Sequence, residues 1–358
     1  MPRELTPGCL EAAVAGGAIL GGGGGGSGEL GAGLGRLALS VGDLFLLAPE
    51  EISPDKTAIT CSLVGAPAAV GSRVLPRDFL RSVQLLMDQL NLDRSEVVLI
   101  SNENGAAASV NGWWQASALG IDLGDIACNG RAHPTGLMGA MGLNRLGDYC
   151  SHQVAVGGNP ANDTYCETYA SGSLQATAKA VRAAADAACG LVAVARNPVP
   201  ASYAAEHGAP GAISAAIEVG TAWLEADEGR SRVEAVVAAL GAGTIFTGEL
   251  VQMCLVTRRG FDVGFAEISV DGTQSLKLSV FNEYMVLQGP RGTIARFPDL
   301  LCLFDEEGIP VTSAELGGLR GNTFHILAVP GDRLILGAGA VDEDNIRACN
   351  ELMEELMP

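Results

Sequence analysis

The sequence predicts an α/β N-terminal domain followed by a β-rich, barrel-like C-terminal domain with flanking helices. Strand-like and helix-like stretches alternate through the first half, and β-branched runs broken by glycine dominate the later part. At 358 residues, the chain also exceeds what one hydrophobic core usually organises. We therefore place an α/β domain at residues 1–165 and a C-terminal region at 166–358. Within that region we expect helices over 166–241, a β-rich unit over 242–340 and a terminal helix over 342–357.

The predicted first domain begins with two helices separated by a glycine run. Residues 8–18 suit a helix, the run Gly21–Gly28 contains six consecutive glycines, and a second helix is expected from Glu29 to about Ser40. Strands are expected at Thr57–Val64 and Glu96–Ser101 because both stretches are apolar and rich in β-branched residues. The apolar stripe Leu80, Val83 and Leu86 predicts a helix over Pro76–Leu90, and an alanine-rich helix is expected to contain Trp113 and Trp114.

In the C-terminal region, a long helix is expected from Cys166 to about Ala188 and a strand over Leu191–Arg196. Two further helices are expected at Ala212–Ala226 and Arg232–Leu240. The stretch after Gly241 predicts strands, with Asp271-Gly272 as a turn signal. Acidic residues at the start of Asp342–Met357 suit the positive end of a helix dipole.

Composition narrows the possible partners and the compartment. The formal charge of −19, from 22 Lys and Arg against 41 Asp and Glu, repels nucleic acid and anionic membranes, so we expect neither as a partner. Nine cysteines are scattered singly, which is typical of reduced thiols in a cytoplasm. Signal-peptide features and apolar runs of membrane-spanning length are absent from the sequence. We expect a cytoplasmic homo-oligomer that binds a small molecule.

The glycine run is a candidate ligand-binding loop. Its residues Gly23, Gly24, Gly25, Gly26 and Ser27 precede the second predicted helix, where free backbone amides can cradle an anion or a carbonyl oxygen. The alternative is that the glycines serve only close packing of helix against sheet. A Lys-Ser or Lys-Thr pair does not follow the run, so it is not a nucleoside-triphosphate loop, and we expect no nucleotide cofactor.

A second candidate site lies directly after an apolar strand. Asn102, Glu103 and Asn104 follow Glu96–Ser101, and ligands of open α/β sheets gather at the carboxyl ends of strands. Asn102 and Asn104 are candidate ligand-binding residues. Glu103 is a candidate general base or metal ligand, because a carboxyl group in a dry cleft has a raised pKa. Its alternative role is to hold backbone amides in the first turn of a helix.

Further candidates occur in two other segments. Asp122, Asp125 and His133 have the ligand chemistry of a divalent cation, and Asp125 is also a candidate catalytic carboxylate. Arg131 is a candidate clamp for a carboxylate, although an Asp and Arg pair that holds a turn is the commoner outcome. In the β-rich part, Asn282-Glu283 places polar side chains directly after an alternating strand, so Asn282 is a candidate ligand-binding residue and Glu283 a candidate catalytic one.

The order of these pieces resembles the S-methyl thiohydantoin desulfurase-like family, formerly domain of unknown function 917. The matching segments are distributed over nearly the whole chain. They are the glycine run, Gly65-Ala66-Pro67, Glu103 to Gly105, Gly130-Arg131-Ala132, Gly260-Phe261, Asn282-Glu283 and Pro298-Asp299-Leu300. His133, Pro134 and Thr135 depart from the family pattern, in which a bulky residue, Pro and Glu follow Gly-Arg-Ala.

The resemblance implies an α/β domain paired with a β-rich domain and an activity in hydantoin-type ring metabolism. The implied reaction is hydrolytic loss of sulfur from a thiohydantoin ring, which needs an activated water and a donor for developing charge. Glu103 or Asp125 would supply the base, and the glycine amides or Arg131 the donor. Two alternatives remain open. One is a ligand-binding or regulatory subunit that partners a hydantoinase-like enzyme, and the other is a nucleotide-dependent ligase or kinase.

Overall fold

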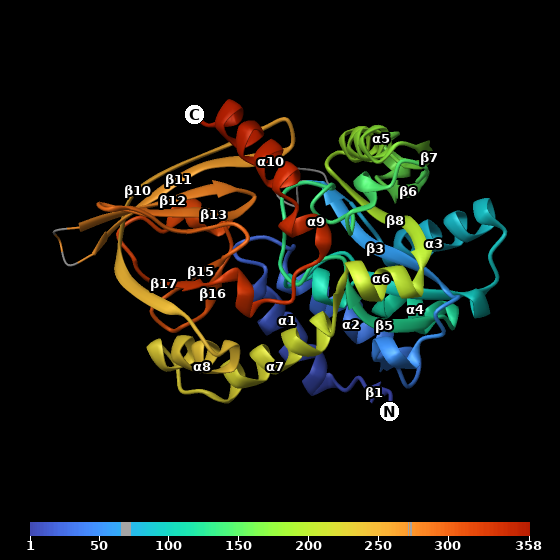
Figure 1. Ribbon diagram of the computed structural model, residues 1–358, viewed down its shortest axis with the longest axis horizontal. Coiled ribbons are helices and arrows are strands. Elements are labelled where there is room, and N and C mark those ends of the chain that lie inside the picture. Colours follow the sequence, from blue (N-terminus) through green and yellow to red (C-terminus); the bar gives the residue numbers. More distant parts are fainter. Residues whose placement is uncertain (66–72, 271, 273) are drawn as a thin grey trace.

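The computed structural model describes residues 1–65, 73–270, 272 and 274–358. Its strands form two sheets that lie side by side, with the N-terminal helices between them (Figure 1). The segment Gly65-Ala66-Pro67 and the predicted turn Asp271-Gly272 each lie partly outside the described residues. Of the helices in the described ranges, none is long and apolar enough to cross a membrane.

The first sheet combines a parallel and an antiparallel half. Among the described residues it has nine strands in the order β1-β2-β5-β4-β3-β8-β6-β7, with β9 beside β5. Parallel pairing joins β2, β5, β4 and β3, so the carboxyl ends of these strands lie at one edge of the sheet. The bounds are β1 Arg3–Glu4, β2 Phe45–Leu47, β3 Thr57–Gly65, β4 Val97–Ser101, β5 Asp122–Ala127, β6 Ser151–Gly157, β7 Cys166–Gly172, β8 Leu191–Pro200 and β9 Ala209–Pro210.

Helices cover the first sheet and begin where capping residues favour them. The Thr6 and Ser27 hydroxyls accept hydrogen bonds from the first turns of α1 (Pro7–Leu20) and α2 (Gly28–Val41). The helix predicted at Pro76–Leu90 is confirmed as α3, which buries Phe79, Val83 and Leu86. The predicted strands at β3 and β4 are confirmed as well. The other helices of this part are α4 Trp113–Leu119, α5 Leu174–Ala187, α6 Ala201–His207 and α7 Ala212–Glu225. Helix α8 (Arg230–Leu240) packs against the second sheet instead.

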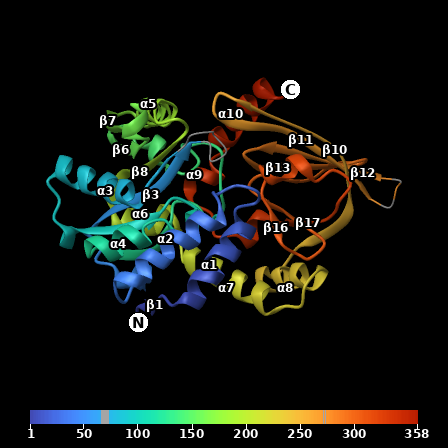
Figure 2. The ribbon, with the colours of Figure 1, turned by 180° about the vertical axis from the view of Figure 1, so that it is seen from behind.

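The second sheet is antiparallel and curls into a half-barrel, as expected for a β-rich C-terminal unit (Figure 2). Its order is β14-β13-β12-β11-β10-β17-β15-β16, and its inner face holds a continuous apolar core that includes Leu278, Phe324 and Ile326. The terminal helix α10 (Glu343–Leu356) starts after the Asp342 cap, as predicted. The remaining bounds are β10 Thr244–Arg258, β11 Phe261–Val270, β12 Gln274–Phe281, β13 Glu283–Gly289, β14 Gly292–Arg296, β15 Leu300–Phe304, β16 Pro310–Val311, β17 Thr323–Val329 and α9 Ala338–Val341.

The long helix predicted from Cys166 to Ala188 is wrong in its first third. Cys166–Gly172 forms β7, which pairs with β6 and alternates half-buried and exposed side chains, and α5 begins only after the Ser173 cap. The period-two pattern and the neighbouring strand outweigh local helix propensity here. The strand predicted at Leu191–Arg196 is confirmed as β8. Since β7, β8 and β9 all join the first sheet, that sheet continues to Pro210. The domain boundary at residue 165 stays a prediction.

The glycine run connects the two halves of the molecule. Gly22 accepts a hydrogen bond from the Tyr284 amide at 2.8 Å, and Gly23 accepts one from the Ser313 amide at 3.0 Å. On the other side, Gly25 accepts from the amides of Ala107 and Ala108, both at 3.1 Å. The run therefore contacts both the first domain and the half-barrel, and its backbone carbonyls accept hydrogen bonds from each of them.

We expect Gly25→Ala to lower the free energy of unfolding by about 2–4 kcal/mol. Gly25 has a φ of 82°, and an added Cβ would lie 2.3 Å from the Gly105 Cα. Such a contact could be relieved only by a shift of the backbone at Gly25 or Gly105. Gly33→Ala is the matched control, because nothing lies within 4 Å of its added Cβ on α2. The control should be neutral or stabilising by up to about 1 kcal/mol. Urea unfolding of both variants measures the contrast, and equal stabilities would refute the close-packing argument.

Candidate functional site

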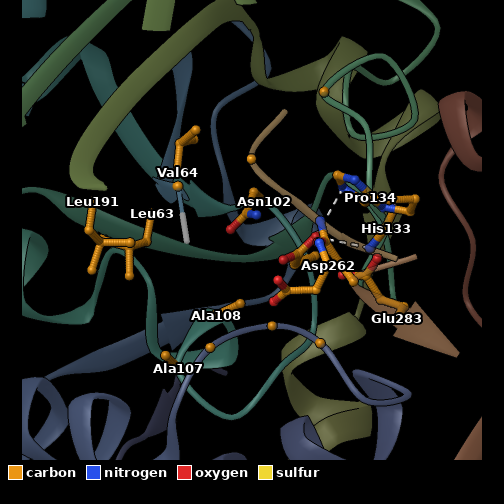
Figure 3. Close-up of a pocket in the computed structure, with 18 of the residues that line it drawn as sticks. Leu63, Val64, Asn102, Ala107, Ala108, His133, Pro134, Leu191, Asp262 and Glu283 are labelled. Carbon is orange, nitrogen blue, oxygen red and sulfur yellow. Dashed lines mark hydrogen bonds and ion pairs between the residues drawn. The ribbon is translucent and has the colours of Figure 1, made fainter. Parts of the chain in front are cut away.

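A cavity of about 440 Å³ lies where the glycine run, the strand ends of the first sheet and the half-barrel meet. Its wall is apolar at one side, where Leu63, Val64 and Leu191 lie, and polar at the other, where His133, Asp262 and Glu283 gather (Figure 3). Several residues predicted from the sequence line it. These are Gly23, Gly24, Gly25, Gly26, Ser27, Asn102, Glu103, His133, Asn282 and Glu283.

Glu103 stands just past the end of β4, at the edge where the parallel strands finish. The Ser101 hydroxyl donates to the Glu103 carbonyl at 3.0 Å and fixes this corner. Burial raises the pKa of the Glu103 carboxyl to about 7, although the charge of Arg196 and the His133 amide, 3.3 Å from Oε2, act in the opposite direction. A carboxyl group with this pKa exchanges a proton near neutral pH, which is what a general base requires.

His133 faces the same carboxylate as a neutral imidazole. Its Nε2 is 3.2 Å from Glu103 Oε2, but the two groups are not aligned for a hydrogen bond. Burial, assisted by the charge of Arg196, lowers the pKa of His133 to about 3. The contact is therefore not an ion pair at neutral pH, and the Glu103 charge is left without a compensating cation in direct contact.

Glu283 brings a second carboxyl group into the cavity from the start of β13. Asn282, with a φ of 59°, forms the turn before it and bonds through its Oδ1 to the Asp262 amide at 2.9 Å. Burial raises the pKa of Glu283 well above its ordinary value, and the Glu103 charge raises it further. Gly24 packs on this carboxyl group, since an added Cβ would lie 2.2 Å from Oε1. The charge of an ionised Glu103 therefore favours the protonated form of Glu283.

The cavity also contains two arginines that the sequence did not reveal as site residues. Arg196 lies on β8, and Arg182 reaches in from α5. Arg182 stacks on the Phe261 ring at 4.2 Å and donates to the Pro134 carbonyl at 3.3 Å. Burial lowers the pKa of both guanidinium groups. A charged residue within the apolar run Leu191–Arg196 was the signal that could have identified Arg196.

Three of the predicted catalytic and ligand-binding residues do not line the cavity. Arg131 is fully buried beneath the glycine run, where it donates to the carbonyls of Pro298 (3.3 Å) and Asp299 and stacks on Phe297. Asn104 donates to two backbone carbonyls, at 3.2 and 2.9 Å. Asp125 accepts hydrogen bonds from the amides of Ile213 and Ser214 at the start of α7. Each of these side chains satisfies backbone groups of another segment, as a structural polar residue does.

The three predicted metal ligands are not brought together. Asp122 bonds to Lys56 at 2.6 Å, Asp125 lies at the start of α7, and only His133 reaches the cavity. Asp122 is exposed, whereas Asp125 is buried against the start of α7. Within the described ranges, His, Cys, Asp and Glu side chains form no group of three suited to a metal ion. The metal hypothesis built on these three residues is wrong.

Two family models match the chain. The S-Me-THD-like N-terminal domain matches residues 9–159, and the S-Me-THD-like C-terminal domain matches residues 173–339. The chain belongs to the S-Me-THD-like family. The resemblance drawn from the ordered motifs is thereby confirmed, since the two matches cover nearly all of the segments that carried it.

This S-Me-THD-like chain is also similar to a solved structure. A crystal structure of a protein from Chromobacterium violaceum superposes with a TM-score of 0.76 at 17% sequence identity, and the match covers 99% of this chain and 97% of that one. At this identity the likeness shows a shared fold. Comparison with curated proteins gives no significant match.

Proposed function

We propose that the protein is an enzyme that hydrolyses a small cyclic amide or thioamide, with loss of sulfur from a thiohydantoin-type ring as the reaction suggested by its S-Me-THD-like family. The observation that carries the proposal is the pair Glu103 and Glu283, two buried carboxyl groups in one cavity. Burial raises the pKa of both groups, that of Glu103 to about 7, and the charge of an ionised Glu103 raises the pKa of Glu283 further, so that the two groups give up their protons in separate steps. Such a difference is typical of a base and an acid that work together.

In this proposal Glu103 activates water and Glu283 assists the leaving sulfur. Ionised Glu103 takes a proton from water as the water oxygen bonds to the ring carbon, and protonated Glu283 donates its proton to the sulfur of the adduct. The adduct then returns its hydroxyl proton to Glu283 as the carbon–sulfur bond breaks and a carbonyl forms. The departing hydrogen sulfide ion takes the proton held by Glu103. Both residues regain their starting states, so a thioamide and water give an amide and hydrogen sulfide.

The cavity has the form that this chemistry needs. A volume of about 440 Å³ accommodates a five-membered ring with a short substituent, and its apolar wall of Leu63, Val64 and Leu191 suits the ring face. The amides of Gly25, Gly26 and Ser27 have no hydrogen-bond partner in the described parts of the chain and precede α2. They are available to stabilise negative charge on the adduct.

Incubation of the purified protein with a panel of hydantoins, thiohydantoins and S-methyl thiohydantoins tests the proposal. Release of sulfide or thiol, or ring opening, is the expected result, and mass spectrometry identifies the product. Binding of ring compounds without any turnover would instead favour the alternative hypothesis of a ligand-binding subunit, since ligand binding alone does not require a pair of catalytic carboxyl groups. Calorimetry with nucleotides checks the ligase or kinase alternative, and we expect no heat.

We expect turnover to rise with pH through about pH 7. The Glu103 carboxyl must be ionised to accept a proton from water, and its pKa of about 7 sets the midpoint of that limb. Below the midpoint, kcat/KM should fall about tenfold for each pH unit. Measurement of kcat/KM between about pH 5 and 9 checks this. A profile that is flat across neutral pH would show that another group, or none, acts as the base.

A further inference from the structure

The guanidinium group of Arg196 is the least satisfied charged group in the cavity wall. Only 7% of Arg196 is exposed, and its Nε is buried without a hydrogen-bond partner. Within the described residues, none of its guanidinium nitrogens donates a hydrogen bond, and no Asp or Glu oxygen lies within salt-bridge distance. Buried arginines are normally paired with anions or saturated by carbonyls.

Arg131 shows what a structural arginine looks like in this protein. It is fully buried, yet it donates to the carbonyls of Ala132, Pro298 and Asp299 and stacks on an aromatic ring. Arg182 is likewise held by a carbonyl and a ring. Arg196 has neither kind of partner, although it lines the same cavity as Glu103 and Arg182. Its partner is therefore expected from outside the chain.

Gln153 lies next to Arg196 and is also incompletely bonded. The two residues are register partners on β6 and β8, so their side chains lie side by side on one face of the sheet. Gln153 donates through Nε2 to Ser151 (3.0 Å) and Thr177 (2.8 Å), which fixes the amide, but its Oε1 is buried without a partner. A ligand that satisfies both must offer acceptor oxygens to Arg196 and an N–H to Gln153.

The charges around the cavity favour an anion for Arg196. Arg182 adds a second positive charge, the amide end of α2 adds a partial one, and Glu283 stays protonated because burial and Glu103 raise its pKa. Glu103 ionises near neutral pH. Its single negative charge cannot neutralise the two positive charges of Arg182 and Arg196. Asp262 and Glu315 are less buried and are screened by solvent.

We infer that Arg196 and Gln153 form a carboxylate-binding subsite, so that the substrate is a cyclic amide or thioamide that carries a carboxylate substituent beside a ring N–H. The inference rests on the proposed function for the ring, but the carboxylate subsite itself follows from Arg196 alone. In this arrangement the guanidinium fork holds the carboxylate, Gln153 Oε1 accepts the ring N–H, and the reacting carbon faces Glu103 and Glu283.

Calorimetric binding of matched ligand pairs tests the subsite. One pair is a hydantoin with a carboxymethyl group at C5 and its carboxamide, and an acyclic pair is glutarate and glutaramide. We expect wild-type protein to bind the carboxylate of each pair at least about tenfold more tightly than the amide, because charge-assisted hydrogen bonds to arginine are lost with the charge. Arg196→Gln should remove that preference, whereas Arg94→Gln, an exposed control at the opposite end of β4, should keep it.

A second measurement separates binding from structure. Because unliganded Arg196 is a buried and unpaired charge, Arg196→Gln should raise the melting temperature of the free protein, and a merely structural arginine would show the reverse. Gln153→Glu would supply a carboxylate from within the chain and should both raise the melting temperature and block the ligand carboxylate. Equal affinity for both members of each pair, or no binding of either carboxylate, overturns the subsite. Carboxylate preference without any turnover would instead refute the proposed reaction and leave the subsite standing.

Discussion

Glu103→Gln should lower turnover of a thiohydantoin by about 10²–10⁴-fold, the usual contribution of a general base. Gln keeps the shape of Glu103 and its contact with the His133 amide region, but it accepts no proton from water. The loss should appear in kcat, with little change in KM, because the group acts on the water in the transition state. Single-turnover kinetics with the best substrate of the panel measure it.

The same variant should be more stable than wild type at alkaline pH. The folded protein holds the Glu103 proton with a pKa of about 7 against an ordinary 4.5, so its stability contribution is complete below about pH 4.5 and is lost as the pH rises through 7. At pH 8 the substitution should therefore raise the free energy of unfolding by about 3 kcal/mol, because the buried charge of Glu103 is absent. Glu315→Gln at the exposed rim of the cavity is the matched control and should change neither property. Full turnover in Glu103→Gln would end the assignment of this residue as the base.

Arg131→Met should lower the free energy of unfolding by about 3–5 kcal/mol. Met fills much of the same volume, but the carbonyls of Pro298 and Asp299 lose their buried donor, and the stacking on Phe297 is lost. These carbonyls belong to the half-barrel, while Arg131 belongs to the first domain, so the two parts should loosen where the cavity forms.

Arg196→Met is the matched comparison, because both arginines are buried but only Arg131 has hydrogen-bond partners among the residues that the structure describes. Arg196→Met should leave stability unchanged or raise it, since no hydrogen bond is broken. Urea unfolding of both variants, with circular dichroism as the readout, tests the contrast. Similar destabilisation by both substitutions would contradict the distinction between a structural and a ligand-binding arginine.

The sequence predicted most elements because periodicity and capping are local properties. Pro76–Leu90 carries an apolar stripe, and Asp342 precedes the last helix as a cap, so both helices were predictable. Cys166–Gly172 misled the prediction because its seven residues are polar or small and adopt a strand only through pairing with β6. Strand formation of this kind depends on a neighbour that is distant in the sequence.

For the site, the residue order alone indicated which chemical groups were available. Glu103 at a strand end, Glu283 after an alternating strand and the glycine run were identifiable because each breaks a local pattern. Which of these polar residues face the cavity depends on how distant segments pack in the folded protein. Asp125 and Arg131 have the same chemical character as Glu103 and Arg196, but they are saturated by backbone groups of distant segments. Hydrogen-bond partners are assigned by folding, and that is why an unpartnered Arg196 becomes visible only in three dimensions.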